Sequence, residues 1–119
     1  MMWTWFLKNK IEIILDNNKA SNIVSIDLKK KSYIADYMII ASGTSSRHLQ
    51  SLSENLITEL KKIGVYNCRM EGKDSKDWKL VDAIDIIIHI FNSEKRVFYD
   101  LEKMWSEPMP KEKTLIWKN

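Results

Sequence analysis

A short apolar run leads, across a polar turn, directly into a long segment with helical spacing. Residues 36–41 form the apolar run, which has the pattern of an interior strand covered on both faces. After the turn, leucine or isoleucine recurs every three or four residues from Leu49 to Ile63, and Gly64 stands where a helix C-cap is expected. Because a buried strand followed at once by an amphipathic helix is typical of α/β proteins, this unit predicts the fold class.

The same patterns extend the prediction to the rest of the chain. Apolar residues have helical spacing in residues 3–15 and again in residues 97–104, where Pro108 and Pro110 end the segment. The strand candidates between these helices are residues 24–28, 67–71, 78–82 and 85–91. The order of helix, two strands, helix, two or three strands and helix predicts an α/β fold with a single mixed β-sheet flanked by helices.

Length and composition are consistent with one domain. The 119 residues are 45% hydrophobic, enough for one core, and we expect a single domain over residues 1–110 with a loose tail at 111–119. The richest apolar runs stop after about five residues, far short of the roughly eighteen that a membrane span needs. Residues 1–15 lack the features of a secretory or transit sequence, and Cys68 is the single cysteine, so we expect a protein of the bacterial cytoplasm.

The charge distribution does not by itself indicate a nucleic-acid-binding protein. The formal net charge is +3, but the 19 basic residues are interleaved with 16 acidic ones, so the summed field is weak. The lysines at 29–31 and the dispersed Lys73, Lys76 and Lys79 could contact phosphates. A solvated loop surface is the simpler interpretation of these lysines, and peripheral contact with RNA is the alternative.

Fragments of a catalytic site are present, but they do not add up to one. Asp82 and Asp85 are three residues apart and, near a Gly-Thr-Ser turn, could hold a divalent metal and a nucleotide, as in nucleotidyltransferases. Against this hypothesis, the turn at Gly43 has a single glycine and lacks the lysine of a phosphate-binding loop. His48 and His89 lack the companion ligands of a zinc site, which favours structural or interface roles. We therefore expect no catalytic residue, no metal and no cofactor.

Two late strands bring aromatic and acidic side chains to defined faces. Alternation along residues 78–82 places Trp78, Leu80 and Asp82 on one face of the strand. In the next strand, His89 falls on the face opposite the three isoleucines, and Asp85 falls on the same side as His89. A mixture of aromatic and acidic groups on one surface would suit a basic protein partner.

Aromatic residues of the last and first predicted helices mark two further candidate interfaces. In the last predicted helix, Tyr99 falls almost opposite the apolar stripe, with Glu102 on the same outward side. An exposed tyrosine beside charged groups has the composition favoured in protein interfaces. Trp3, Trp5 and Phe6 of the first predicted helix belong either to the core or to the surface of a homodimer.

Several motifs, in this order, resemble those of the ribosomal silencing factor (Iojap) family. They are Ile34-Ala35-Asp36-Tyr37, Ala41-Ser42-Gly43-Thr44-Ser45-Ser46-Arg47-His48, Glu71-Gly72, residues 78–85 and the Arg-Val-Phe-Tyr-Asp-Leu-Glu-Lys-Met-Trp sequence at 96–105. The resemblance spans roughly residues 3–110. It implies a mixed sheet flanked by helices, similar to the nucleotidyltransferase fold but without its catalysis.

The resemblance also implies a function. Members of the family bind the large ribosomal subunit through ribosomal protein uL14, block joining of the small subunit by steric exclusion and repress translation when nutrients are short, and organellar relatives assist maturation of the large subunit. The residues that match the family's binding surface are Trp78, Leu80, Asp82, Asp85, His89, Tyr99 and Glu102. A metal-dependent nucleotidyltransferase-like enzyme and an assembly factor that binds ribosomal RNA stay open as alternatives.

Two positions depart from the family pattern. Ile84 stands where the family usually has a glycine between the two aspartates, and Lys79 stands where the family has an apolar residue after the tryptophan. If the glycine serves a positive φ angle, an isoleucine in its place imposes strain or a different turn. The net positive charge is a further difference from the acidic character expected of the family, and it would suit additional contacts with ribosomal RNA.

Overall fold

The order of helices and strands follows the prediction. The computed structural model describes residues 2–30 and 35–93. Over these residues the chain forms α1 (Met2–Asn17), β1 (Ser21–Asp27), β2 (Tyr37–Gly43), α2 (Ser46–Lys62), β3 (Arg69–Glu71), β4 (Trp78–Asp82) and β5 (Ile86–Asn92). The expected helix at 97–104 and the expected boundary between residues 110 and 111 lie outside the described residues.

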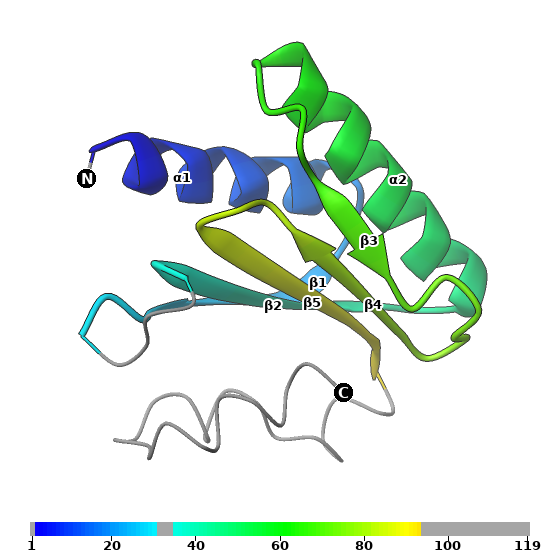
Figure 1. The fold of residues 1–119 in the computed structure, drawn as a ribbon. Coiled ribbons are helices and arrows are strands. Elements are labelled where there is room, and N and C mark those ends of the chain that lie inside the picture. The colour runs from blue at the N-terminus through cyan, green and yellow to red at the C-terminus, as the bar shows by residue number, and fades with distance from the viewer. Residues whose placement is uncertain (1, 31–34, 94–119) are drawn as a thin grey trace.

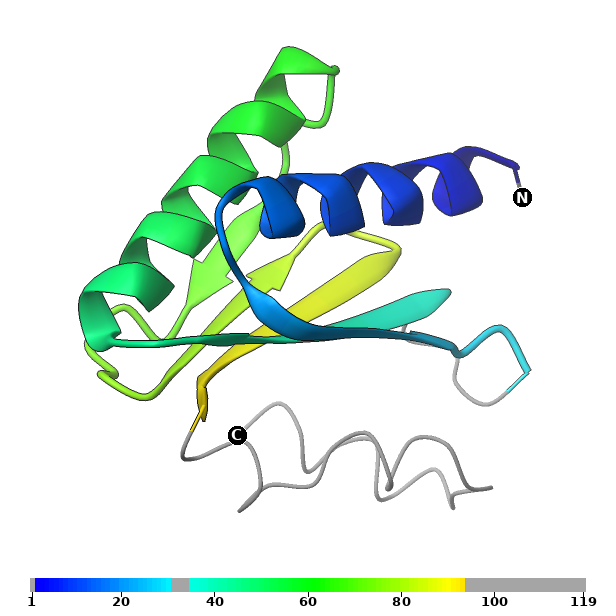
Figure 2. The same cartoon turned by 180° about the vertical axis from the view of Figure 1, so that it is seen from behind.

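The strands form one mixed sheet, and both helices lie on the same side of it (Figures 1 and 2). The strand order is β1-β2-β5-β4-β3. The central pair, β2 and β5, is parallel, whereas the three other neighbouring pairs are antiparallel. The predicted fold class, an α/β protein with a mixed sheet flanked by helices, is therefore confirmed.

The main core lies between the sheet and the two helices. In α1, Leu7, Ile11 and Leu15 are buried, as the helical spacing predicts, whereas Trp3 is 50% exposed although the same spacing places it on the apolar face. In α2 the buried residues include Leu49, Leu52, Leu56 and Leu60. Each fully buried aliphatic side chain contributes on the order of 1.5–3 kcal/mol, so these two stripes hold both helices on the sheet. β2 is buried along its whole length, as expected of an interior strand.

Both ends of α2 are capped by local sequence. Ser45 is the N-cap, because its Oγ accepts a hydrogen bond from the backbone N–H of His48 at 3.1 Å. At the C-terminus Gly64 has φ +94°, and the N–H groups of Gly64 and Val65 donate to the carbonyls of Lys61 and Leu60. This pair of hydrogen bonds is the Schellman motif, which a glycine one residue beyond the C-cap permits. The helix therefore ends at the glycine where the sequence predicts its C-cap.

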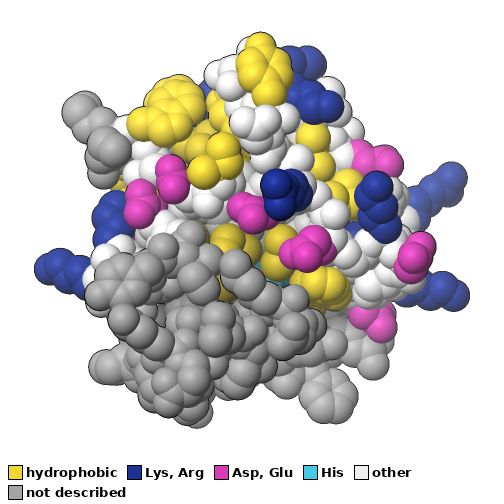
Figure 3. Space-filling view, viewed as in Figure 1, with side chains coloured by type: hydrophobic (Ala, Val, Ile, Leu, Met, Phe, Trp, Pro, Cys, Tyr) yellow, Lys and Arg dark blue, Asp and Glu magenta, His cyan; other side chains and the backbone are white. Residues whose placement is uncertain are grey.

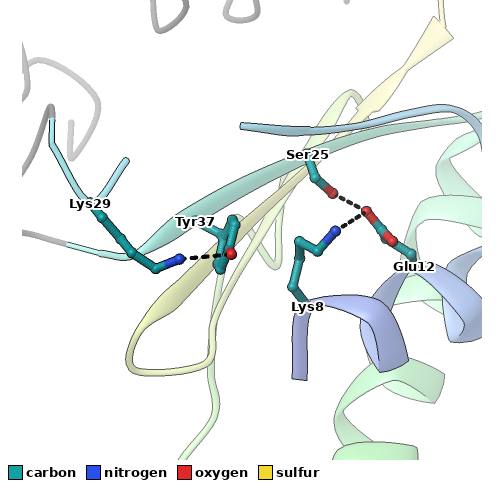
Figure 4. Close-up of polar contacts among 5 residues, drawn as sticks. All are labelled: Lys8, Glu12, Ser25, Lys29 and Tyr37. Atoms are coloured by element: carbon teal, nitrogen blue, oxygen red, sulfur yellow. Dashed lines mark hydrogen bonds and ion pairs between the residues drawn. The ribbon is translucent and has the colours of Figure 1, made fainter. Parts of the chain in front are cut away.

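A polar network joins α1 to the β1–β2 hairpin (Figure 4). The carboxylate of Glu12 accepts hydrogen bonds from Ser25 of β1 and from Lys8. Lys29 Nζ lies 2.8 Å from the hydroxyl of Tyr37 and 4.3 Å from the centre of its ring. The hydrogen bond to Tyr37 is the main cause that raises the pKa of Lys29 above its usual value. Lys29 is thus engaged within the protein, which weakens its candidacy as a phosphate contact.

The other side of the sheet, which we call the distal face, points away from α1 and α2. Its apolar part is a second buried cluster that contains no residue of either helix. This cluster comprises Ile26, Leu28, Ala35, Met38, Ile40 and Phe91, with Val24, Trp78 and Ile87 packed against it. Val24, Ile26 and Leu28, the alternate residues of the strand predicted at 24–28, all belong to this cluster, as one buried face of a strand requires. The sheet therefore separates two hydrophobic clusters, and the distal one borders the candidate site.

Candidate functional site

Strand register brings four of the predicted site residues together on the distal face. In the antiparallel β4–β5 pair, Trp78 lies opposite Phe91, Leu80 opposite His89, and Asp82 opposite Ile87. Directly opposed residues of an antiparallel pair point to the same face. Trp78, Leu80 and Asp82 therefore share a face, as the alternation predicts, and the register adds His89 to form one contiguous group.

The indole of Trp78 is fixed by a ring system on β5. Its Nε1–H group donates a hydrogen bond to Nδ1 of His89 at 3.2 Å, and the two ring centroids are 6.3 Å apart. The imidazole of His89 in turn stacks on Phe91, with the ring centroids 5.9 Å apart and the planes inclined by 3°. Three aromatic rings thus follow one another across two strands. Sequence alternation assigns faces within each strand, whereas the register of the two strands brings the three rings to one face in this order.

Burial divides the predicted set into supporting and accessible residues. Leu80 is 6% exposed and His89 is 2% exposed, while Trp78 and Asp82 are partly exposed and Asp85 is exposed. Burial lowers the pKa of His89 to about 4, so its imidazole is neutral at pH 7. Because Nδ1 accepts from the indole, the proton of the neutral ring lies on Nε2. His89 and Leu80 therefore position Trp78, and the accessible groups are Trp78, Asp82 and Asp85.

The loop between β3 and β4 supports Trp78 from the other side. Gly72 has φ +81°, and a Cβ atom at this position would lie 2.8 Å from Cε3 of Trp78 and 2.8 Å from its carbonyl oxygen. Ser75 Oγ accepts the backbone N–H of Trp78 at 3.1 Å. Sequence reasoning did not assign a role to Gly72, although the Glu71-Gly72 motif was a usable signal. The glycine permits the loop backbone to lie against the indole.

Lys79 is a second supporting residue that sequence reasoning missed. It is 2% exposed, and its Nζ donates hydrogen bonds to the carbonyls of Gly72 at 2.8 Å and Lys73 at 2.7 Å. The expectation of a solvated or phosphate-contacting side chain is therefore wrong for Lys79, because the β3–β4 loop folds back over its ammonium group. Lys73 and Lys76 are exposed in the same loop.

The turn between β4 and β5 holds the two aspartates in different ways. Oδ1 of Asp82 accepts the backbone N–H of Ile84 at 3.0 Å, and Ile84 has φ +69°. The backbone carbonyl of Asp85 accepts the N–H of Asp36 at 2.7 Å, which ties the starts of β5 and β2 together. Ile84, which stands where the family usually has glycine, therefore holds a positive φ, the condition under which an isoleucine at this position is strained. The carboxylate of Asp85 stays exposed.

A hollow of about 580 Å³ lies where the β3–β4 ladder ends. It is lined by Tyr66, Asn67, Cys68, Arg69, Asp82 and Ile84. Burial raises the pKa of the Cys68 thiol, which disfavours the nucleophilic thiolate form at neutral pH. Acidic and basic side chains are interspersed with apolar ones on the side of the molecule seen in Figure 3. The hollow therefore borders the candidate site through Asp82 without gathering charge of one sign.

The other catalytic and metal-binding candidates are not brought together. His48 ties α2 to the turn after α1, because its Nε2 lies 2.9 Å from the carbonyl of Asn18 and its Nδ1 accepts the N–H of Thr44. Within residues 2–30 and 35–93, no group of three or more histidine, cysteine, aspartate or glutamate side chains could hold a metal ion. Among these residues, no helix is long and apolar enough to cross a membrane. Tyr99 and Glu102, the remaining predicted site residues, lie outside the described residues.

Comparisons with known proteins agree on one family. The family model described as "Ribosomal silencing factor during starvation" matches residues 7–117. The chain is 48% identical over 91 residues to the ribosomal silencing factor of Zymomonas mobilis, and the aligned region covers 76% of this chain and 68% of that protein. It is 46% identical over 92 residues to the ribosomal silencing factor of Haemophilus influenzae, and this aligned region covers 77% of the chain and 90% of that protein.

A solved structure extends the agreement to the fold. The crystal structure of a protein from Chromobacterium violaceum superposes with a TM-score of 0.81 at 30% sequence identity. The superposition covers 90% of this chain and 89% of that one. The family suggested by the motifs at residues 34–48, 71–72, 78–85 and 96–105 is thus confirmed by sequence and by fold. This chain belongs to the ribosomal silencing factor family.

Proposed function

We propose that this protein binds the large ribosomal subunit through ribosomal protein uL14, prevents the small subunit from joining and thereby represses translation in the bacterial cytoplasm. The observation that carries the proposal is the match of the family model to residues 7–117 of a chain in which Trp78, Leu80, Asp82 and His89 form one supported surface. Binding alone is sufficient for this mechanism, because a protein seated on the intersubunit side excludes the small subunit sterically. No catalytic step is required.

The accessible part of the site has the chemistry expected of a protein interface. Trp78 is an aromatic anchor held on both sides, by His89 and by Gly72, so little side-chain freedom is lost when a partner covers it. The carboxylates of Asp82 and Asp85 lie at the same end of the β4–β5 hairpin. Acidic groups around an aromatic anchor complement the basic surface of a ribosomal protein and steer its approach. In this proposal Tyr99 and Glu102 extend the same docking surface.

The test is co-sedimentation of the purified protein with separated ribosomal subunits, followed by a subunit-joining assay. We expect binding to the large subunit and loss of joined ribosomes as the protein concentration rises. Trp78→Ala is expected to weaken binding by about thirtyfold, which corresponds to roughly 2 kcal/mol for a hot-spot aromatic. Ile13→Ala is the control, because Ile13 is 53% exposed on α1, on the other side of the sheet and outside both proposed surfaces.

Three outcomes would redirect the proposal. A loss below about threefold for Trp78→Ala would exclude this surface as the docking site. Absence of binding to either subunit, together with magnesium-dependent nucleotide binding that Asp82→Asn abolishes, would favour the nucleotidyltransferase-like alternative. Binding to naked ribosomal RNA with a steep salt dependence would favour the RNA-binding alternative. The burial of Lys79, and the hydrogen bond that the exposed Lys29 makes to Tyr37, count against the last of these.

Self-association is the remaining part of the proposal on partners. Trp3, Trp5 and Phe6 are 50%, 57% and 46% exposed, and the rings of Trp3 and Phe6 stack with centroids 5.9 Å apart. An apolar surface of this kind on α1 would suit a homodimer. Analytical ultracentrifugation of the full chain measures this directly, and a change from dimer to monomer on Trp5→Ala would assign the interface.

A further inference from the structure

The loop between β3 and β4 is held by a buried lysine rather than by exposed polar contacts alone. Lys79 follows Trp78 in β4 but points to the other face, because it lies opposite Ile90 of the main core. An ammonium group buried to this extent must be matched by hydrogen-bond acceptors. The carbonyls of Gly72 and Lys73 provide them, at 2.8 and 2.7 Å. The side chain therefore fastens the first residues of the loop to β4.

The fastened residue is the one that touches the indole. Gly72 lies so close to Trp78 that even an added methyl group would meet Cε3 at 2.8 Å. The carbonyl of Gly72 also accepts the N–H of Ser75 at 3.0 Å, and Ser75 caps the start of β4. A displacement of Gly72 therefore removes one wall of the space that the indole occupies. The opposite wall is His89, which the indole N–H contacts at 3.2 Å.

We propose that Lys79 is a positioning residue for the docking surface: its contact with the loop carbonyls holds Gly72 against the indole and so keeps Trp78 in its binding orientation. The role of this orientation in ribosome binding rests on the proposed function, whereas the structural link from Lys79 to Trp78 does not. The proposal also explains the departure from the family pattern at this position. A lysine serves here because its long stem lies in the sheet layer while its ammonium group reaches the loop.

The test measures two quantities separately: the hydrogen exchange of the Trp78 indole N–H group and the affinity of the protein for the large subunit. In Lys79→Met, which keeps the length of the stem but removes the donors, we expect hydrogen exchange of the Trp78 Nε1–H group to accelerate by about tenfold and the affinity for the large subunit to fall by about fivefold. Lys76→Met is the matched control, since it removes the same charge from an exposed residue of the same loop. Unchanged indole exchange in a folded Lys79→Met protein would overturn the proposal.

A double-mutant cycle separates positioning from general stability. If Lys79 acts through Trp78, adding Lys79→Met to Trp78→Ala should lower the affinity by less than about twofold more, whereas additive losses would contradict the proposal. If Trp78→Ala lowers the affinity by less than about threefold, the docking surface of the proposed function fails, and hydrogen exchange of the indole in Lys79→Met still decides whether Lys79 positions Trp78. Should Lys79→Met not fold, Lys79→Arg retains donors and is expected to keep indole exchange within about twofold of the unsubstituted protein. A folded Lys79→Arg protein with an unprotected indole would contradict the proposal.

Discussion

Ile84 holds a backbone conformation that isoleucine rarely adopts. Its φ of +69° lies in the left-handed region, where a side chain with a Cβ costs roughly 1–2 kcal/mol. The side chain is 57% exposed, so little burial compensates for this strain. The Asp82 carboxylate, which accepts the N–H of Ile84, helps to hold the turn in this form. The strain is therefore located in the turn that joins the two strands of the candidate site.

Ile84→Gly is expected to stabilise the protein by about 1 kcal/mol, because relief of the left-handed strain exceeds the extra chain entropy that glycine brings to the unfolded state. Urea denaturation measures the change in the free energy of unfolding. Ile84→Ala is the control, since alanine removes the same exposed side chain but keeps a Cβ at positive φ. Equal stability of the two variants would contradict the strain argument.

His89 couples the stability of the protein to pH. Its pKa is about 4 in the folded state, against 6.5 for an ordinary histidine, because burial disfavours the charged form. The unfolded chain therefore takes up a proton first as the pH falls, and stability is lost between about pH 6.5 and pH 4. The total loss is on the order of 3 kcal/mol, and stability above pH 6.5 is unaffected by this group. The free energy of unfolding, measured by urea denaturation at several pH values, checks this expectation.

His89→Gln isolates this contribution. Glutamine does not titrate, so the difference in unfolding free energy between the two proteins should shrink as the pH falls from 6.5 to 4. His48 is present in both proteins and cancels in the comparison. A difference that stays constant over this interval would show that His89 is not the group responsible.

At the scale of elements, two loops use glycine at positive φ for different reasons. Gly64 has φ +94° after α2, and nothing lies within 4 Å of the position of an added Cβ. Gly72 has φ +81° after β3, and an added Cβ would meet the indole and carbonyl of Trp78 at 2.8 Å. Gly64 is therefore required only for its positive φ angle. Gly72 is required both for its positive φ angle and for its close contact with Trp78 in the candidate site.

Gly64→Ala and Gly72→Ala form a matched pair that separates these reasons. We expect Gly64→Ala to cost about 1 kcal/mol of unfolding free energy and to leave the affinity for the large subunit unchanged. Gly72→Ala should cost more, because the clash with Trp78 adds to the strain, and it should also weaken binding by about tenfold. Urea denaturation and co-sedimentation with the large subunit supply the two measurements. Equal effects of the two substitutions on binding would argue against the contact of Gly72 with Trp78 as a determinant.

At the scale of the whole molecule, the proposed mechanism makes this protein compete with the small subunit for the large subunit. A protein that acts by steric exclusion should bind free large subunits and be excluded from ribosomes that are already joined. We therefore expect no co-sedimentation with joined ribosomes. Co-sedimentation with the large subunit should appear once the ribosomes are dissociated by lowering the magnesium concentration. Stoichiometric binding to intact joined ribosomes would contradict steric exclusion.

The agreement between sequence and structure is uneven across the chain for a physical reason. Helical spacing and strand alternation depend on neighbouring residues, so α2 with its C-cap, the buried β2 and the common face of Trp78, Leu80 and Asp82 could all be predicted. The positive φ at Ile84 was suspected because glycine was expected there. The family, too, was evident from short motifs.

Contacts between segments distant in sequence could not be predicted in this way. No local pattern shows that the ammonium group of Lys79 meets the carbonyl of Gly72, or that the indole of Trp78 meets His89, eleven residues further along the chain. The lysine pattern indicated a solvated surface, whereas the folded loop buries Lys79 against its own backbone. The sequence by itself determined the order of elements and the residues that face the candidate site. Only the tertiary structure decided which of those residues are accessible and which support them, because burial depends on how strands and loops meet in space.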